Sequence, residues 1–378
     1  MSKLRFVLLS ILLTTICSCD KKEIKNPLAA ALSSENVAIK RVMDTLEQHE
    51  VQIRFTQIKR EGDSVAFKNH DFQLAKNQYF YPASTVKFPI AVLTLEKLNE
   101  IDSLSMHTRF YVEGDSVETT FADEITKIFA VSDNQSYNRL FEFLGQNKIH
   151  QKLQERGLET IRISHRLASD NANDVTTQPL IIYLNDSTTA TLSGSINTPP
   201  KPLILEKIEK GTGYLKDDEF IAEPFDFSLK NYYPIEAQHE VLKRIIFPES
   251  YPSDSQFNLS DAQRQFILKA MHTLPKVQGY NEEEYYDSYV KFFMYGDTKE
   301  PIPEHIKIYN KVGYAYGTLT DCAYIIDEEN GIEFLISATI LVNKDGVFND
   351  DAYEYEEIGI PFLAALGREV YQQLLATK

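Results

Sequence analysis

The sequence predicts a mixed α/β fold of the α+β type, in which an antiparallel sheet is flanked by helices and carries an inserted helical subdomain. Apolar and polar residues alternate over 51–58 and 64–67 around a turn, which predicts a β-hairpin near the start of the chain. Near the end, further strands are expected over 306–312, 322–326 and 333–340. Helical patterns lie between these segments, so strands from both ends of the chain are expected to share one sheet.

The helices follow from apolar residues at helical spacing. One is expected from Ser34 onwards, and one over 85–99 that is apolar on nearly every side and therefore belongs in the core. Others are expected over 121–145, 146–157, 260–274 and 355–375. We assign no element to 201–257, which is rich in proline and aromatic residues.

This order predicts one discontinuous domain over 34–378. Its α/β part comprises about 34–85 and 300–378, and about 86–299 is mainly helical with the unassigned insertion inside it. The chain has 378 residues, of which 43% are hydrophobic, so it can bury a large core. Its formal net charge of −16 argues against a nucleic-acid partner. Nothing in the sequence fixes the oligomeric state.

The first 19 residues resemble an export signal of a bacterial lipoprotein. Lys3 and Arg5 precede an apolar stretch over 6–16 that is too short to span a bilayer. The stretch ends in Ile16-Cys17-Ser18-Cys19, where the small Ser18 before Cys19 is typical of a lipidation site. We expect a lipid on Cys19, a polar tether over 20–33, and a membrane-anchored enzyme in the bacterial periplasm or on the cell surface. An ordinary cleaved signal peptide is the alternative.

Three short motifs carry the candidate chemistry. Ser84 and Lys87 lie one helical turn apart at the start of the apolar helix, so the two side chains share a face. A lysine there can be desolvated, which makes it a base able to activate the serine. Ser132-Asp133-Asn134 follows an apolar helix and offers a second hydroxyl and a carboxamide. Lys311-Val312-Gly313 ends a strand, where a lysine can attract a carboxylate and a glycine lets substrate approach.

Together these segments resemble the serine β-lactamase and penicillin-binding superfamily, whose signatures are Ser-x-x-Lys, Ser-Asp-Asn and Lys-Thr-Gly in that order. The patterns Ser-Asp-Asn-x-x-x-Asn-x-Leu at 132–140 and Tyr-Gly-Thr-x-x-Asp-x-Ala at 316–323 are similar to class A members, and the resemblance covers roughly 35–170 and 258–376. It implies a β-lactamase/transpeptidase-like fold and an enzyme without a metal or organic cofactor.

The resemblance also implies a role for each matching residue. Ser84 would be acylated, Lys87 would activate it, and Ser132 would transfer a proton. The substrate would be held by Asn134, Lys311, Gly313 and Tyr314, and the backbone amides of Ser84 and Tyr314 would form the oxyanion hole.

The chain departs from the family pattern in three places. Val312 replaces a hydroxyl residue that would bind the substrate carboxylate, which costs about 1.5 to 3 kcal/mol for a hydrogen bond to a charge. The spacing between Asn134 and Lys311 is long by roughly seventy residues. Ala168 stands where class A enzymes carry the deacylating glutamate. Three acidic residues could substitute, and the sequence does not choose among them: Glu159, Asp170 and Asp174.

We therefore expect a serine hydrolase that opens β-lactam amide bonds through an acyl-enzyme, with a β-lactam or peptidoglycan-like small molecule as its partner. A penicillin-binding D-Ala-D-Ala peptidase or esterase with slow deacylation is a second hypothesis. A non-catalytic surface lipoprotein on the same scaffold is a third, because a fold does not fix a function.

Overall fold

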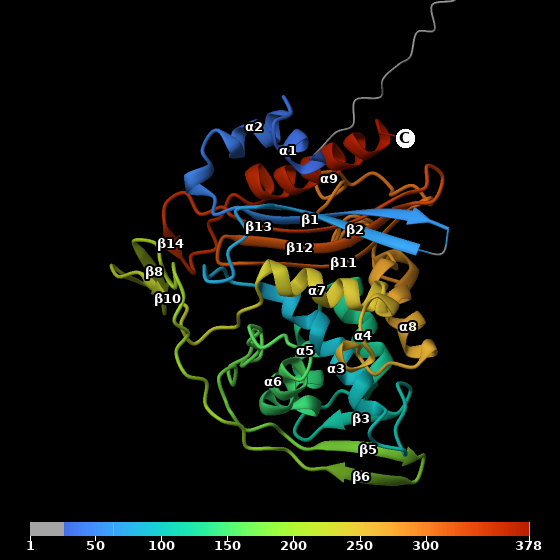
Figure 1. Ribbon diagram of the computed structural model, residues 1–378. Helices are drawn as coiled ribbons and strands as arrows, with labels where there is room; N and C mark the ends of the chain where they lie inside the picture. Colours follow the sequence, from blue (N-terminus) through green and yellow to red (C-terminus); the bar gives the residue numbers. More distant parts are fainter. Residues whose placement is uncertain (1–25, 63, 378) are drawn as a thin grey trace, which may run out of the picture.

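The computed structural model describes residues 26–62 and 64–377, and a five-stranded antiparallel sheet lies at its centre (Figure 1). Strand order is β11-β12-β13-β1-β2, so strands from the two ends of the chain meet where β1 pairs with β13. The bounds are β1 Gln52–Glu61, β2 Ser64–Phe72, β11 Ile306–Ala315, β12 Thr318–Asp327 and β13 Ile332–Leu341. The predicted hairpin and the sheet built from both chain ends are confirmed.

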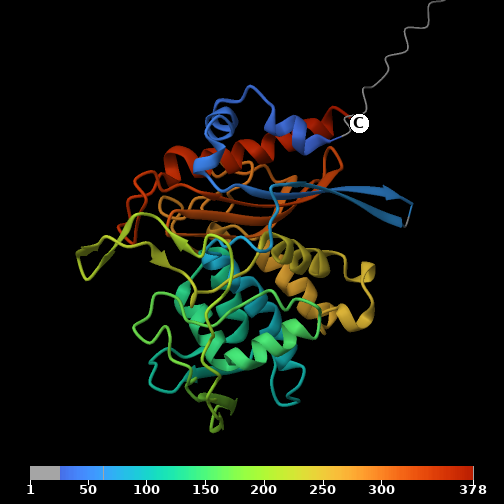
Figure 2. The same ribbon diagram turned by 60° about the vertical axis from the view of Figure 1, so that its left-hand side comes forward.

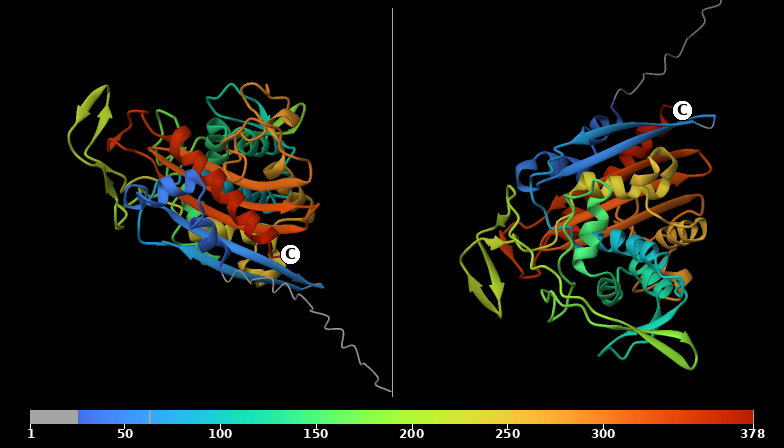
Figure 3. Two further views of the ribbon diagram at one scale, coloured as in Figure 1. Left: turned by 90° about the horizontal axis from the view of Figure 1, so that it is seen from above. Right: turned by 60° about the horizontal axis from the view of Figure 1, so that its bottom comes forward.

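Helices from both chain ends cover one face of this sheet (Figures 1 and 3). They are α1 (Pro27–Leu32), α2 (Val37–Met43) and α9 (Ile360–Leu375), and a π-helical turn over Tyr355–Gly359 precedes α9. Leucine, isoleucine and phenylalanine side chains from these helices and from the sheet form one hydrophobic core. Burying each such side chain contributes roughly 1.5 to 3 kcal/mol, so the packing offsets the chain entropy of ordering remote segments.

The predicted tether over 20–33 is wrong for its described part, because α1 lies within it. Asn26 caps the helix by accepting the amide of Ala29 at 3.1 Å, and Pro27 occupies the first helical position, where its missing N–H costs nothing. Leu28 and Leu32 are buried. The predicted signal peptide over 1–19, with Cys19, lies outside the described residues. Within the part of the chain that the structure describes, no helix is long and apolar enough to cross a membrane.

The other face of the sheet is covered by α7 (Ile235–Ile246), and the helical body lies beyond it (Figure 1). That body contains α3 (Lys87–Leu98), α4 (Phe121–Ala130), α5 (Asn134–Leu144), α6 (Gln146–Gln154) and α8 (Asp261–His272). Every residue of α3 except Lys97 is buried, so the predicted core helix is confirmed. Helix α8 begins at the capping box of Ser260 and Gln263.

Short strands lie outside the elements that the sequence predicted, and four of them fall within 201–257, where we assigned no element. One four-stranded sheet has the order β4-β3-β5-β6, and smaller sheets pair β10 with β7 and join β14, β8 and β9. Their bounds are β3 Arg109–Val112, β4 Thr119–Thr120, β5 Leu180–Asn185, β6 Thr188–Leu192, β7 Glu209–Lys210, β8 Gly213–Lys216, β9 Glu219–Ile221, β10 Phe225–Asp226 and β14 Val347–Phe348. All but two of these strands have two to four residues and are too short to show a hydrophobic period, which explains why the sequence did not reveal them.

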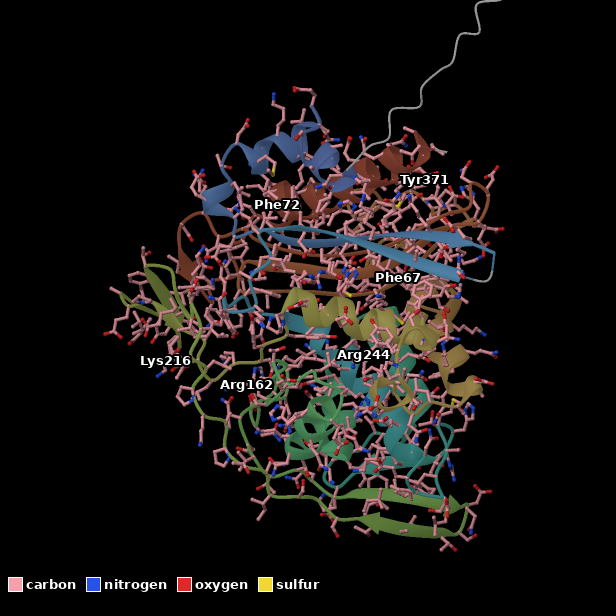
Figure 4. All side chains as sticks on the ribbon, in the orientation of Figure 1. Phe67, Phe72, Arg162, Lys216, Arg244 and Tyr371 are labelled. Atoms are coloured by element: carbon pink, nitrogen blue, oxygen red, sulfur yellow. The ribbon has the colours of Figure 1, made fainter. Side chains whose placement is uncertain are left out.

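Residues 201–234 run beside the helical body, and their β8–β9 hairpin projects from one side of the molecule (Figure 2). Arg162, labelled in Figure 4, joins the two parts. Its guanidinium donates to the carbonyls of Lys201 at 2.8 Å and Ser228 at 3.0 Å. Further along, Phe225 contacts Tyr316 at the β11–β12 turn, with ring centroids 5.3 Å apart. The insertion therefore reaches the end of the central sheet at which the candidate residues gather.

Candidate active site

Ser84 lies on a 3₁₀ turn over Ala83–Val86 that leads directly into α3. Ala83 adopts a left-handed backbone conformation with φ of 45°, and Thr85 Oγ1 donates to the carbonyl of Pro82 at 2.7 Å. Ser84 is partly exposed, while the other residues of the turn are buried. The turn thus presents one hydroxyl at the surface of an otherwise buried helix start.

Lys87 is fully buried at the first position of α3, and its ammonium reaches the Ser-Asp-Asn segment. Nζ donates to Asn134 Oδ1 at 2.6 Å and to the backbone carbonyl of Ser132, and it lies 3.4 Å from Ser132 Oγ. Burial lowers the pKa of Lys87 to about 7, although the negative charge of Asp133 acts in the opposite direction and raises it. A lysine with that pKa is half neutral at physiological pH and can act as a base.

Ser132 stands between two lysines from opposite parts of the fold. Its Oγ accepts a hydrogen bond of 2.7 Å from Lys311 Nζ on β11 and lies 3.4 Å from Lys87 Nζ. The backbone of Ser132 has φ of 58°, a conformation that costs a non-glycine residue roughly 1 to 3 kcal/mol and is found most often at functional sites. Burial and the nearby charge of Lys87 lower the pKa of Lys311 well below its ordinary value.

Gly313 brings strand β11 against the Ser84 turn. A Cβ atom at this position would lie 2.7 Å from the backbone nitrogen of Ser84 and 2.7 Å from the carbonyl oxygen of Pro82, closer than real side chains allow. Only glycine therefore permits this approach. Tyr314, the next residue, lines the same cavity as Ser84.

That cavity has a volume of about 490 Å³. Its wall is formed mainly by tyrosines and small residues, and it contains the partly exposed nucleophile candidate and the carboxamide of the Ser-Asp-Asn segment. The lining residues are Tyr81, Ala83, Ser84, Asn134, Leu167, Ala168, Tyr314, Ala315, Tyr316, Asn349, Asp351, Tyr353 and Tyr355. Of the predicted site residues, Ser84, Asn134 and Tyr314 line this cavity, whereas Lys87 and Lys311 both contact Ser132, and Gly313 packs against the Ser84 turn.

Comparisons with known proteins agree with this fold. Residues 36–191 match the model of the beta-lactamase enzyme family, and no curated protein matches the sequence. The solved structure of PBP-A is similar over 92% of this chain and 96% of its own, with 14% identity and a TM-score of 0.51. A β-lactamase from Xanthomonas campestris is similar over 92% and 98%, with 15% identity and a TM-score of 0.50. The chain has the serine β-lactamase and transpeptidase-like fold.

The loop that closes one side of the cavity is held by polar contacts to α5. Asn138 donates to the carbonyl of Leu167 and accepts its amide, both at 2.9 Å, and Arg166 forms a buried ion pair with Glu142. These contacts hold Leu167 and Ala168 in the cavity wall. The position predicted to lack the deacylating glutamate therefore faces the cavity that contains Ser84.

None of the three carboxylates that we considered as substitutes lines this cavity: Glu159, Asp170 and Asp174. Its carboxylate is Asp351, which comes from the segment between β14 and α9. The sequence reasoning missed Asp351 and the neighbouring Tyr353 and Tyr355, because an acidic, tyrosine-rich segment far along the chain resembles any exposed loop.

A third buried lysine, Lys291, contacts Asn310, which precedes Lys311 on β11. Lys291 is 1% exposed, and its Nζ donates to the carbonyl of Met271 at 2.7 Å and to Asn310 Oδ1 at 2.6 Å. Asn310 in turn donates to Asp321 at 2.9 Å. Burial lowers the pKa of Lys291 to about 7 and raises that of Asp321 to about 6. Asp321 belongs to the pattern noted at 316–323, whereas nothing in the sequence distinguished Lys291.

Proposed function

We propose that the chain is a serine hydrolase of the class A β-lactamase-like type, which opens the amide bond of β-lactams or related acylated amides through an acyl-enzyme on Ser84. One observation carries the proposal. The ammonium groups of Lys87 and Lys311, from different elements, converge on Ser132 Oγ at 3.4 and 2.7 Å beside a cavity lined by Ser84. Burying two cations together is expensive, and proton transfer gives a reason for it.

Acylation of Ser84 depends on the protonation state of Lys87. In its neutral form it accepts the proton of Ser84 Oγ as that oxygen bonds to the substrate carbonyl carbon. When the carbon–nitrogen bond breaks, the leaving nitrogen receives a proton from Ser132, which regains one from the lysine pair. Atoms balance over the step, because the serine proton ends on the leaving nitrogen and the acyl group on Ser84.

The remaining roles are assigned to groups around the cavity. The backbone amides of Ser84 and Tyr314 stabilise the oxyanion, and Gly313 permits their approach. Asn134 holds Lys87 and the substrate amide. Lys311 attracts a substrate carboxylate, although Val312 adds no hydroxyl beside it, so affinity for acidic β-lactams is reduced.

Slow deacylation is the second part of the proposal, and the position of Ala168 favours it. An apolar residue in the cavity wall cannot activate water, so the acyl-enzyme should persist. Persistence is what separates a penicillin-binding peptidase or esterase from an efficient lactamase. The lifetime of the adduct distinguishes these two functions.

The test uses purified protein, a chromogenic cephalosporin and benzylpenicillin. We expect one adduct per chain on Ser84 by mass spectrometry, a burst of one equivalent, and slow release afterwards. Ser84→Ala should abolish the adduct, whereas Ser187→Ala, at the exposed β5–β6 turn, should leave it unchanged. Neither a burst nor an adduct in the native chain would remove the β-lactam part of the proposal.

We also propose that the chain is exported and carries a lipid on Cys19, on the strength of the N-terminal pattern. The test is metabolic labelling with a radioactive fatty acid in a bacterial host. Label should appear in the native chain and in Cys17→Ala, and should be lost in Cys19→Ala. Label that survives Cys19→Ala would overturn the assignment.

A further inference from the structure

Tyrosine rings form much of the wall of the candidate cavity, and they come from three segments that are remote in the sequence. Tyr81 packs edge-on against Tyr316, with ring centroids 5.0 Å apart and planes at 87°. Tyr355 contacts both Tyr314 and Tyr353, each at 5.4 Å between centroids. The faces of such rings carry partial negative charge, which attracts cations.

Asp351 lies within this wall of rings. It is exposed, it lines the cavity, and no ion pair or hydrogen bond to its side chain is found among the described residues. Burial raises the pKa values of Tyr316, Tyr353 and Tyr355, and the negative charge of Asp351 raises each of them further. The carboxylate is thus a free negative charge at the mouth of the cavity.

Among the described residues, no cationic side chain lines the cavity, and Lys87 and Lys311 are both buried. Lys311 donates to Ser132 Oγ and to the carbonyl of Val312, so two of its three donors already have partners. An anionic group at the mouth would therefore meet Asp351 and the ring faces without a compensating cation. A cationic group would be attracted by both.

We propose that this wall, Asp351 with Tyr316, Tyr353 and Tyr355, is a subsite for a positively charged ammonium group on the acyl side of the substrate. The subsite rests on the proposed acyl-enzyme function and refines it. The preferred substrate class is an acylated amide whose acyl side chain carries a primary amine, and an acyl side chain with a carboxylate is disfavoured.

The experiment compares three penicillins that share one nucleus and differ in one side-chain substituent. Ampicillin carries an ammonium group, benzylpenicillin a hydrogen and carbenicillin a carboxylate. We expect the second-order rate constant of acylation to fall in that order, by about fivefold at each step at low salt, as for one exposed charge pair in water. The differences should shrink at 1 M salt, because screening is then strong over about 3 Å.

Asp351→Asn removes the charge that distinguishes the three substituents, each step being worth about fivefold. The three rate constants should therefore come within about twofold of one another. Asp217→Asn is the matched control, because it removes the same charge from the exposed β8–β9 turn, outside the cavity. It should leave the order intact. An order that is unchanged in Asp351→Asn, or lost equally in Asp217→Asn, would overturn the subsite.

Binding to Ser84→Ala, measured by calorimetry with the same three compounds, separates this proposal from the proposed function. If none of the three acylates the native chain, the acyl-enzyme is wrong, and the order of the three affinities still tests the subsite. Equal affinities, or tighter binding of carbenicillin, would refute it. The tightest binding for ampicillin, lost in the double variant with Asp351→Asn, would support it.

Discussion

Lowering the pH from 8 to 6 should slow the acylation of Ser84 about tenfold, because Lys87 accepts the proton only in its neutral form. Burial lowers the pKa of this lysine to about 7. With that pKa, roughly nine-tenths of Lys87 is neutral at pH 8 and roughly one-tenth at pH 6. An ordinary lysine would instead give rates that still rise up to about pH 10.

The assay is stopped-flow acylation by benzylpenicillin across pH 5 to 9, with the pre-steady-state amplitude as a check on folding. The variant Asp133→Asn adds a second test of the pH profile, because the negative charge of Asp133 raises the pKa of Lys87. Removing that charge should move the midpoint of the profile to lower pH, while asparagine can still cap α5 as Asp133 does for Ser136. Asp170→Asn, on the exposed loop, is the control. A rate that still rises about tenfold per pH unit at pH 9, or a midpoint that shifts to higher pH in Asp133→Asn, would refute the assignment of Lys87 as the base.

Three further predictions test other parts of the site. Gly313→Ala places a Cβ 2.7 Å from the amide of Ser84, so it should cost about 1 to 3 kcal/mol in the free energy of unfolding and abolish the burst, as measured by denaturant titration and stopped flow. Ala168→Glu introduces a carboxylate into the cavity wall and should shorten the lifetime of the acyl-enzyme by about a hundredfold or more, followed by mass spectrometry; an unchanged lifetime would show that a missing base is not the cause. Arg166→Ala leaves Glu142 without its buried partner and should cost about 3 to 5 kcal/mol, which thermal unfolding will detect, whereas the double variant with Glu142→Ala should recover part of that loss.

The sequence was a good guide wherever a pattern repeats over many residues. The hairpin and the core helix α3 followed from period and composition, and the three motifs identified the residues that meet around Ser132. It was a poor guide to α1, because six residues that begin with a proline and follow an asparagine look like a tether until α9 is present to bury Leu28 and Leu32.

The same limit applies to the site. Asp351 and Lys291 belong to no motif. Asp351 matters because it lines the cavity, and Lys291 matters because it makes buried hydrogen bonds. Contacts between residues far apart in the chain cannot be inferred from local composition. They depend on how the sheet closes.

The pairing of β13 with β1 determines when, during synthesis and folding, the cleft can form. The amide of Leu341 donates to the carbonyl of His49 at 2.7 Å, and β13 joins the β11–β12 pair to β1. Lys311 and Gly313 therefore reach the Ser84 turn only when a strand made near the end of synthesis docks onto one made near its beginning. Such distant pairing is slow to form. An emerging or truncated chain that stops before β13 would carry every motif residue and still have no working cleft.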